Sequence, residues 1–548
     1  MSTNPSPTTA KRPVGVVRIL FPAFVVGLAA AVLLIAWQWP GTEVDSSTIS
    51  MVKSLTVIVA GVLLLLWALR MPGWRKRYVW IVFLGGIGLS MVFVRFHSMW
   101  GKFLPIFVAR DWVQDAFFGG SPDTLLERHR QAQGRAEGGA DLTIKPGDWP
   151  GYRGANRDGV ATGATIARDW STSPPKEVWR QPVGGGYAAF SYANGFLVTI
   201  EQRRDQEVVV CYEAATGKEA WTTGSNSRFS ESAGGDGPRA TPTIADGDVF
   251  AFGATGRLAC LAGNDGKEKW AVDTLEGNQN LRWGMSGSPL VVDNVVVVNA
   301  GAQTEAAKGR ALRAYDRTTG IEVWAAGNYQ AGYSSPQLAT LCGKPQILLF
   351  DGHGIAGHDL DGGAQLWRMA WPTGFEVNAA QPIVIGDDTL LIGSGYDQGG
   401  ARIRVTNTGT SWSVAEVWRS KRTEMRYKFA SPVRRKDATG DYVYGLNDGV
   451  LECVDVKTGR VKWKDGYGNS QRDSFRHGQI VLVDDLIVAL TETGDLVLVE
   501  ATSEAFRELG RIKALNRGTK TWNNPAMAHG RIYIRNDQEM ACYDLTGK

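Results

Sequence analysis

The stretch Asp455–Trp463, DVKTGRVKW, reads as a strand that ends, a tight turn, and a second strand that carries a tryptophan. Gly459 supplies the positive φ that such a turn needs, and the carboxylate of Asp455 can accept hydrogen bonds from the turn backbone. One hairpin of this kind says little about a fold. The chain repeats it, however, and the repeat decides the fold.

Copies of this hairpin recur along the second part of the chain. The tryptophans that end the copies are Trp221, Trp270, Trp324, Trp367, Trp418 and Trp463. Neighbouring tryptophans lie 43 to 54 residues apart. A degenerate copy begins at Glu500, and the last half-copy, Tyr543–Gly547, lacks its tryptophan. A period of ~40–50 residues built from short strands and turns is typical of the blades of a β-propeller. Helical repeats are disfavoured because runs such as Val481–Val483 are short, Val-rich and bounded by turn residues.

A second repeated feature gives an independent count of the blades. Once per period, a short step of small, amide or proline residues opens a hydrophobic strand. The eight steps are Ala189-Phe190, Thr241-Pro242, Ser288-Pro289, Ser335-Pro336, Gln381-Pro382, Ser431-Pro432, Gly478-Gln479 and Asn524-Pro525. Trp179 precedes the first complete blade, so its strand should complete the last one and leave no open sheet edge. We predict an all-β propeller with eight blades; seven is the alternative.

These repeats carry a resemblance to a known superfamily. The pattern D-x-x-T-G-x-x-x-W, the Ser-Pro steps and the opening Asp148–Gly154 (DWPGYRG) resemble the pyrroloquinoline quinone (PQQ) repeat superfamily. That superfamily includes quinoprotein alcohol and glucose dehydrogenases and the non-enzymatic, BamB-like assembly proteins. The resemblance covers residues 148–548 and implies that the tryptophans dock between neighbouring blades. It is specific for the fold and much less so for an activity.

Three apolar runs precede the repeats: Val14–Trp39, Leu55–Leu69 and Tyr78–Val94. Each is long enough, with its flanks, to cross ~30 Å of hydrocarbon as a helix. A cleaved signal peptide is the alternative for the first run, but no small-residue cleavage site follows it. We therefore predict an α-helical membrane anchor of three transmembrane helices ahead of the propeller.

Charge placement orients this predicted anchor. Cations precede the first run and separate the second from the third, whereas the loop after the first run carries Glu43 and Asp45. The positive-inside rule then predicts a cytoplasmic tail (1–13), a membrane anchor (14–96), a juxtamembrane linker (97–147) and a propeller (148–548). We expect the protein in the cytoplasmic (inner) membrane of a bacterium, with the propeller facing the periplasm.

Composition excludes some classes of function. The 548 residues carry a formal charge of only +4, so nothing indicates nucleic-acid binding. The chain contains no H-E-x-x-H, G-x-S-x-G or P-loop motif.

Four of the five cysteines, Cys211, Cys260, Cys453 and Cys542, occupy one blade position, which predicts buried thiols in the core. A bond between adjacent blades, such as Cys542 with Cys211, is the alternative.

Residues just before each inner strand of a propeller converge on the mouth of its channel. The residues that we predict to bind a cofactor there are Arg239, Trp283, Tyr333, Asn378, Lys428, His477, Trp522 and Asn523. Together they form an aromatic and cationic ring with amide groups. Such a ring suits a planar anionic ligand, because an indole can stack on it while Arg and Lys pair with its carboxylates.

The resemblance makes PQQ, with Ca²⁺, the possible cofactor at this mouth, stacked on a tryptophan. The quinoprotein enzymes use a Glu/Asn/Asp cluster for Ca²⁺ and an Asp as general base, and Ca²⁺ requires several oxygen ligands. The predicted ring has no acidic residue at an equivalent step, although Glu231, Glu376 and Asp473 lie a few residues upstream. We therefore assign no catalytic and no metal-binding residue.

Two functions from different classes follow. The first is a binding or scaffold module for a protein partner in the periplasm or envelope, resembling BamB, and it needs no catalytic set. The second is a PQQ-dependent, membrane-bound dehydrogenase that oxidises an alcohol or a sugar. The absence of an acidic cluster from the predicted ring disfavours an enzyme, so we predict the scaffold function in preference to the dehydrogenase.

Overall fold

A computed structural model describes residues 16–38, 46–70, 76–99, 105–136, 138–301, 309–465, 475–516, 518 and 520–547. The chain separates into two compact units, Met1–Arg110 and Asp111–Lys548, and each is described by itself. The predicted domain boundaries stay predictions. The predicted tail (1–13) and Asp473 lie outside the described residues.

The first unit contains helices and one hairpin. Its elements are α1 (Val16–Gln38), α2 (Ser46–Arg70), α3 (Lys76–Phe93), β1 (Val94–Met99) and β2 (Pro105–Ala109). The prediction of a three-helix transmembrane anchor is wrong: among the helices that the structure describes, none combines the length and the hydropathy that a bilayer crossing requires. The helices extend beyond the apolar runs and include charged residues, since Lys53 lies inside α2 and Lys76 opens α3.

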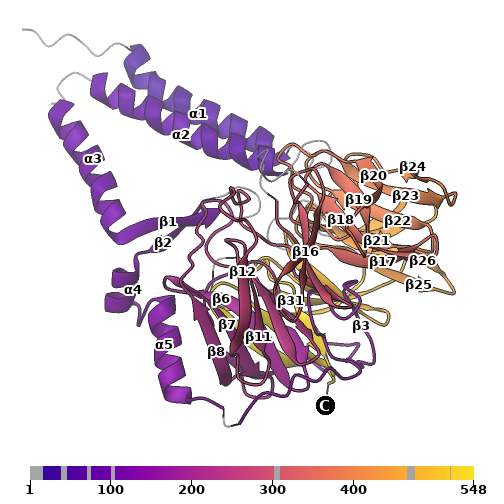
Figure 1. The fold of residues 1–548 in the computed structure, drawn as a ribbon. Helices are drawn as coiled ribbons and strands as arrows, with labels where there is room; N and C mark the ends of the chain where they lie inside the picture. The colour runs from indigo at the N-terminus through magenta and orange to yellow at the C-terminus, as the bar shows by residue number, and fades with distance from the viewer. Residues whose placement is uncertain are drawn as a thin grey trace, which may run out of the picture. The chain divides into compact units, whose positions relative to one another are not determined.

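The second unit begins with α4 (Asp111–Phe117) and α5 (Pro122–Gln133) and continues as eight antiparallel sheets, whose strands are labelled in Figure 1 where there is room. The first four blades are β5 (Ser191–Ala193), β6 (Phe196–Arg203), β7 (Gln206–Glu213), β8 (Glu219–Ser225); β9 (Thr243–Ala245), β10 (Asp248–Phe252), β11 (Arg257–Ala262), β12 (Glu268–Asp273); β13 (Leu290–Val292), β14 (Val295–Asn299), β15 (Leu312–Asp316), β16 (Glu322–Ala326); and β17 (Gln337–Leu341), β18 (Lys344–Asp351), β19 (Gly354–Asp359), β20 (Gln365–Ala370).

The remaining four blades follow the same order from the channel outward. They are β21 (Ile383–Val384), β22 (Thr389–Ser394), β23 (Gly399–Asn407), β24 (Trp412–Arg419); β25 (Val433–Asp437), β26 (Gly440–Asn447), β27 (Val450–Asp455), β28 (Val461–Lys464); β29 (Gln479–Val483), β30 (Leu486–Leu490), β31 (Asp495–Glu500), β32 (Glu508–Lys513); and β33 (Ala526–Ala528), β34 (Arg531–Arg535), β35 (Glu539–Asp544), β4 (Lys176–Pro182). The predicted eight-bladed propeller is confirmed.

The ring closes as predicted, by an N-terminal strand that completes the last blade. β4 pairs with β35, and Trp179 lies opposite Cys542 in their register. The inner strand β33 also lies beside β5 of the first blade. A further short strand, β3 (Val160–Ala161), pairs in parallel with β29. Chain closure therefore joins segments more than 300 residues apart in sequence.

Tryptophan docking between blades explains why the hairpin repeats. The indole Nε1 of Trp221 donates to Gly263 O of the next blade at 2.7 Å, and Trp463 donates to Thr502 O at 2.7 Å. Trp179, Trp270, Trp324 and Trp418 make the corresponding bond to the following turn. Trp367 departs from this pattern and donates to Gln346 Oε1 within its own blade. The predicted docking is thus present in six copies.

Two requirements explain the glycine in the repeated turn: a positive backbone φ angle and the close approach of the docking tryptophan. Gly459 has φ 71°, and a Cβ there would lie 2.7 Å from the Trp418 ring. Any larger residue would meet both the left-handed penalty and the indole of the preceding blade. The repeated T-G and W positions therefore belong to one contact between neighbouring blades.

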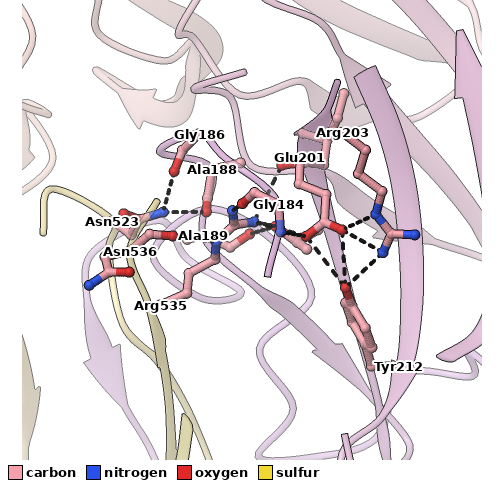
Figure 2. A network of polar contacts seen from close by, with 12 residues as sticks. Gly184, Gly186, Ala188, Ala189, Glu201, Arg203, Tyr212, Asn523, Arg535 and Asn536 are labelled. Atoms are coloured by element: carbon pink, nitrogen blue, oxygen red, sulfur yellow. Dashed lines mark hydrogen bonds and ion pairs between the residues drawn. The ribbon is translucent and has the colours of Figure 1, made fainter. Parts of the chain in front are cut away.

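A buried polar network joins the last blade to the first (Figure 2). Arg535 on β34 is fully buried and donates to Gly184 O at 2.6 Å and to Thr199 Oγ1 at 2.9 Å. Its guanidinium lies 4.0 Å from Glu201, which also accepts from Tyr212 Oη at 3.2 Å. Burial lowers the pKa of Arg535. These bonds hold the seam of the ring on its inner side.

Helix α5 covers the same seam from outside. Arg130 donates to Glu219 of β8 at 2.8 Å, and His129 lies within hydrogen-bond distance, 3.2 Å, of Gln181 of β4. Helix α5 therefore packs on the first and last blades.

The cysteines are buried thiols, as predicted. Cys211, Cys260, Cys453 and Cys542 each lie opposite a docking tryptophan in the strand register. All five are free, and Cys342 is partly exposed. Burial raises the pKa of the Cys453 thiol to about 12, so it behaves as a small apolar side chain.

Candidate functional site: the mouth of the channel

The loops that enter the inner strands gather at one end of the channel, which we call the mouth. Phe429 lies 4.9 Å from Trp522 and 5.2 Å from His477, between ring centroids. Tyr187 lies 5.5 Å from Trp522 on its other side. The structure therefore brings Trp522 and His477 of the predicted ring together, through a phenylalanine that the prediction did not include.

Lys428 and His477 share one buried carboxylate. Lys428 Nζ lies 2.9 Å from Asp448 Oδ1, and His477 Nε2 lies 4.0 Å from the same oxygen. Arg426 Nη1 lies 4.0 Å from Asp448 Oδ2. All four side chains are more than nine-tenths buried. The charge of Lys428 is thus paired within the protein and buried with its partner.

Arg239 is engaged by the loop that precedes it. Its guanidinium donates to Gly235 O at 2.7 Å and to Gly237 O. It also lies 4.4 Å from the Phe229 ring centroid and 5.7 Å from that of Tyr187. Burial lowers the pKa of this guanidinium, partly offset by Tyr187, Glu231 and other acids.

Trp283 and Tyr333 form a separate pair in the second and third loops. Their ring centroids lie 5.7 Å apart, and Tyr333 Oη lies 3.4 Å from the backbone nitrogen of Trp283. Arg282 lies over the indole at 5.0 Å. Burial raises the pKa of the Tyr333 hydroxyl, so it stays protonated at neutral pH.

The two predicted amides are fully buried and bridge backbone segments. Asn378 Nδ2 donates to Asp351 O at 2.8 Å and to Trp371 O at 3.1 Å. Asn523 Nδ2 donates to Ala188 O at 2.9 Å, across the seam of the ring, as Figure 2 shows. Their geometry is that of groups that hold adjacent blades. Their assignment as cofactor ligands stays a prediction.

Lys520 is the residue at the mouth that sequence reasoning missed. It is 1% exposed, and its Nζ lies 3.8 Å from the Trp522 ring centroid. It donates to Ala233 O at 2.9 Å, although Ala233 lies in the loop between the first and second blades. Burial lowers its pKa to about 7, against the opposing effect of Glu492. Its position two residues before Trp522 was the available signal.

The described residues, as they are arranged, do not fit a tricarboxylate cofactor with Ca²⁺. The aromatic faces are present, but Lys428 is paired with Asp448, and Lys520 and Arg239 already donate to backbone carbonyls. Within the described ranges, no group of three or more His, Cys, Asp or Glu side chains is placed to hold a metal ion. We therefore assign no reaction step at the mouth to PQQ or to a metal ion.

The segment 148–161, which we call the floor, contacts the turns that follow the inner strands: Asp148 accepts a hydrogen bond from the backbone nitrogen of Asn194, after β5, and lies 2.9 Å from His529, after β33. Arg157 Nη1 donates to Ser288 O at 3.1 Å and to Pro336 O at 3.0 Å, in two different blades. Arg153 donates to Ser431 O at 3.1 Å and to Pro432 O at 2.7 Å.

Both floor arginines are buried, and burial lowers the pKa of Arg157 to about 10. Their backbone φ angles, 60° and 57°, lie in the left-handed region that L-residues seldom adopt. Arg153 of the DWPGYRG motif and Arg157 just after it therefore bond the third, fourth and sixth blades to one segment inside the ring.

Comparisons with known proteins agree with this architecture. The family model described as "Outer membrane protein assembly factor BamB" matches residues 162–283, 278–465 and 419–548. No curated protein matches the chain.

Two solved structures are similar in fold. BamB from Moraxella catarrhalis is 16% identical, with a TM-score of 0.46, over 68% of this chain and 97% of that one. The quinohemoprotein alcohol dehydrogenase ADHIIG from Pseudomonas putida HK5 is 12% identical, with a TM-score of 0.49, over 74% of this chain and 81% of that one.

Proposed function

The chain belongs to the family of the outer membrane protein assembly factor BamB, and we propose that it is a scaffold whose propeller docks a protein partner on its mouth face. The observation that carries the proposal is a band of aromatic side chains on the third to fifth blades. We call it the aromatic band: Trp283, Tyr329, His353, Phe375 and Tyr396.

Four members of the band form two contacting pairs. Tyr329 lies 5.3 Å from His353, and Phe375 lies 5.8 Å from Tyr396, between ring centroids. Tyr329 is 44% exposed and Phe375 is 54% exposed. An exposed aromatic ring supported by a half-buried one is typical of the anchors of protein–protein interfaces.

Arginines add to this character. Arg368 lies 3.8 Å from the Tyr329 ring centroid, and Arg282 lies over Trp283. Trp, Tyr and Arg are the residue types that contribute most to binding energy at protein interfaces. Because loops on a rigid ring need little ordering on binding, the entropy cost of docking is small. We place this docking in the periplasm of a bacterium, on the outer side of the cytoplasmic membrane.

Site-specific photo-crosslinking in intact cells tests the proposal. We expect a photoreactive residue at position 375 or 329 to give one discrete crosslinked partner. The same residue at position 323, exposed on the outer edge strand β16, is the control and should give none. The variant Phe375→Ala should reduce the yield at position 329 at least about tenfold, the effect of a lost hot spot. Equal crosslinking at all three positions would overturn the proposal.

A PQQ-dependent alcohol or sugar dehydrogenase is the second candidate. The observation that favours it is the pair of aromatic faces, Trp522 and Tyr187, with Lys520 beside them at the mouth. Titration with PQQ and Ca²⁺, followed by dye-linked oxidation of alcohols and sugars, tests it; absence of binding at micromolar PQQ would rule it out.

A further inference from the structure

A pocket opens between helix α5 and the outermost strand of the last blade, on the outside of the ring. Its volume is about 250 Å³. The residues that line it come from α5, from the end of β4 and from the start of β35, and they include Pro122, Leu125, Arg180, Gln181, Pro182 and Glu539. These residues belong neither to the mouth nor to the aromatic band, so the pocket has no role in the functions considered above.

The walls of the pocket suit an apolar group better than a charged one. Pro122, Leu125 and Pro182 supply apolar surface. The charge of Arg180 is already balanced, since its guanidinium lies 2.7 Å from Glu177 and 3.3 Å from Glu539. A charged ligand would therefore lose its water without meeting an unbalanced counter-charge. An apolar side chain would instead gain free energy from its burial.

Two aromatic side chains project into solvent where α4 leads into α5. Phe117 is 71% exposed and Phe118 is 70% exposed. The backbone that carries them is held by hydrogen bonds, because the nitrogens of Phe118 and Gly120 both donate to Gln114 O, at 2.9 Å and 3.1 Å. The two rings are therefore held in water by a fixed backbone, at a free-energy cost that burial against another surface would remove.

Contacts within the chain place these rings beside the pocket. Arg128 Nη1 of α5 donates to Gly119 O at 2.7 Å. A Cβ at Gly120 would lie 3.2 Å from the side chain of Leu125, which is one of the pocket walls. Phe118 directly precedes these two glycines, so a protruding aromatic group and an apolar pocket lie side by side. We call this surface the seam surface, and its residues are Phe117, Phe118, Pro122, Leu125 and Arg128.

A surface of this kind can bind a second copy of itself. In a two-fold pair the same patch of each copy faces the other, so each protruding ring meets the other copy's pocket. A fully enclosed aromatic side chain buries roughly 150–250 Å². With the surface that receives the four rings, a pair of copies would bury roughly 800–1,400 Å², which spans the range from weak to standard-size specific interfaces.

The charges at the edge of the seam surface are also complementary between two copies. Arg128 of α5 and Asp115 of α4 are both exposed. Asp115 is held near the start of α5, since its carboxylate accepts a hydrogen bond from the backbone nitrogen of Ser121 at 2.6 Å. A two-fold arrangement therefore allows each carboxylate to face the guanidinium of the other copy.

We propose that the seam surface joins two copies of the chain in a two-fold dimer, with Phe118 of each copy in the pocket of the other. The aromatic band lies on the third to fifth blades, whereas the seam surface lies on α4 and α5, beside the first and last blades. Dimer formation is therefore independent of the scaffold function, and it goes beyond that function because one assembly then presents two mouths.

Sedimentation velocity of the full-length protein over about 1 to 100 µM tests the proposal. We expect a dimer fraction that rises with concentration. Phe118→Ser should weaken the dimer at least about tenfold, the effect of a lost interface anchor, and should fold normally because the ring is exposed. Phe375→Ser, which removes an exposed ring of the aromatic band, is the matched control and should leave the dimer unchanged. A protein that stays monomeric throughout, or equal weakening by both variants, would overturn the proposal.

Cross-linking between differently tagged copies identifies what occupies the pocket. One copy carries Phe118→Cys and the other carries Leu125→Cys, and both carry Cys342→Ser because that thiol is partly exposed. In cells that express both copies, we expect a short bismaleimide to join the two tags. Val323→Cys in place of Phe118→Cys, at an exposed site on β16, is the control and should give no mixed product. Absence of the mixed product, or cross-linking of position 118 to a different protein, would overturn the proposal.

Discussion

The two ends of the channel hold their cations in different ways. At the floor, Arg157 donates to backbone carbonyls just before the inner strands of two blades, and these acceptors are fixed by the ring itself. At the mouth, Lys520 and Arg239 donate to carbonyls of one loop. An acceptor that belongs to the sheet framework cannot leave without disturbing the ring, whereas an acceptor on a self-contained loop can be exchanged. The floor therefore serves stability, and the mouth can serve binding.

The largest expected effect comes from breaking the floor. Arg157→Met should lower the free energy of unfolding by about 3 kcal/mol, because buried carbonyls of two blades lose their donor. Urea denaturation measures this change. Arg282→Met, at an exposed arginine of the mouth, is the matched control and should change stability by no more than about 0.5 kcal/mol. Equal losses in both variants would mean that the floor contributes no special stability.

The second prediction concerns the turn glycine of the repeated hairpin, and the expected loss of stability is smaller. Gly459→Ala should cost about 2 kcal/mol, since the new methyl meets both a positive φ and the Trp418 indole. Gly409→Ala also has a positive φ, 87°, but open space around its Cβ, and should cost about 1 kcal/mol. The difference between these two losses of unfolding free energy, measured by thermal or urea unfolding, gives the contribution of the contact between the turn and the Trp418 indole. Identical losses would exclude that contact as the reason for the glycine.

These elements show why the fold could be predicted from sequence. A T-G turn and a tryptophan are needed in nearly every blade because each blade docks on the next, so the requirement appears as a repeat. The mouth could be predicted only in part. Trp522 and His477 both lie against Phe429, but Lys520 lies in an irregular loop and Asp448 in the turn between β26 and β27, where spacing carries no period.

The remaining differences have equally physical reasons. The hydrogen bonds of Arg153 and Arg157 could not be predicted from the sequence. Their acceptors are backbone carbonyl groups, which are present whatever the side chains are. The membrane anchor was predicted from three apolar runs, but none of the described helices has the length and hydropathy that a membrane crossing requires.

A third prediction concerns pH. The pKa of Lys520 is about 7 in the folded protein and 10.5 in the unfolded chain. Between these values the unfolded chain binds more protons, so this residue makes the protein more stable as pH rises from about 7 to 10.5. Below pH 7 Lys520 is protonated in both states, so the full free-energy cost of burying its ammonium group destabilises the folded protein. Lys520→Met should remove this contribution, so the variant should gain stability relative to the unmodified protein at pH 6 and lose that advantage by pH 10. A constant stability difference across this range would contradict the burial of the amine.

The comparison between floor and mouth is tested most directly by native-state hydrogen exchange on the unliganded protein. The amides of Gly235 and Gly237 in the mouth loop 229–237 and of Arg157 and Gly159 in the floor all bond to backbone carbonyls. If this loop opens locally while the floor opens only with global unfolding, the loop amides should exchange at least about a hundredfold faster. Equal protection at both ends would contradict the account, because the mouth would then be as fixed as the floor.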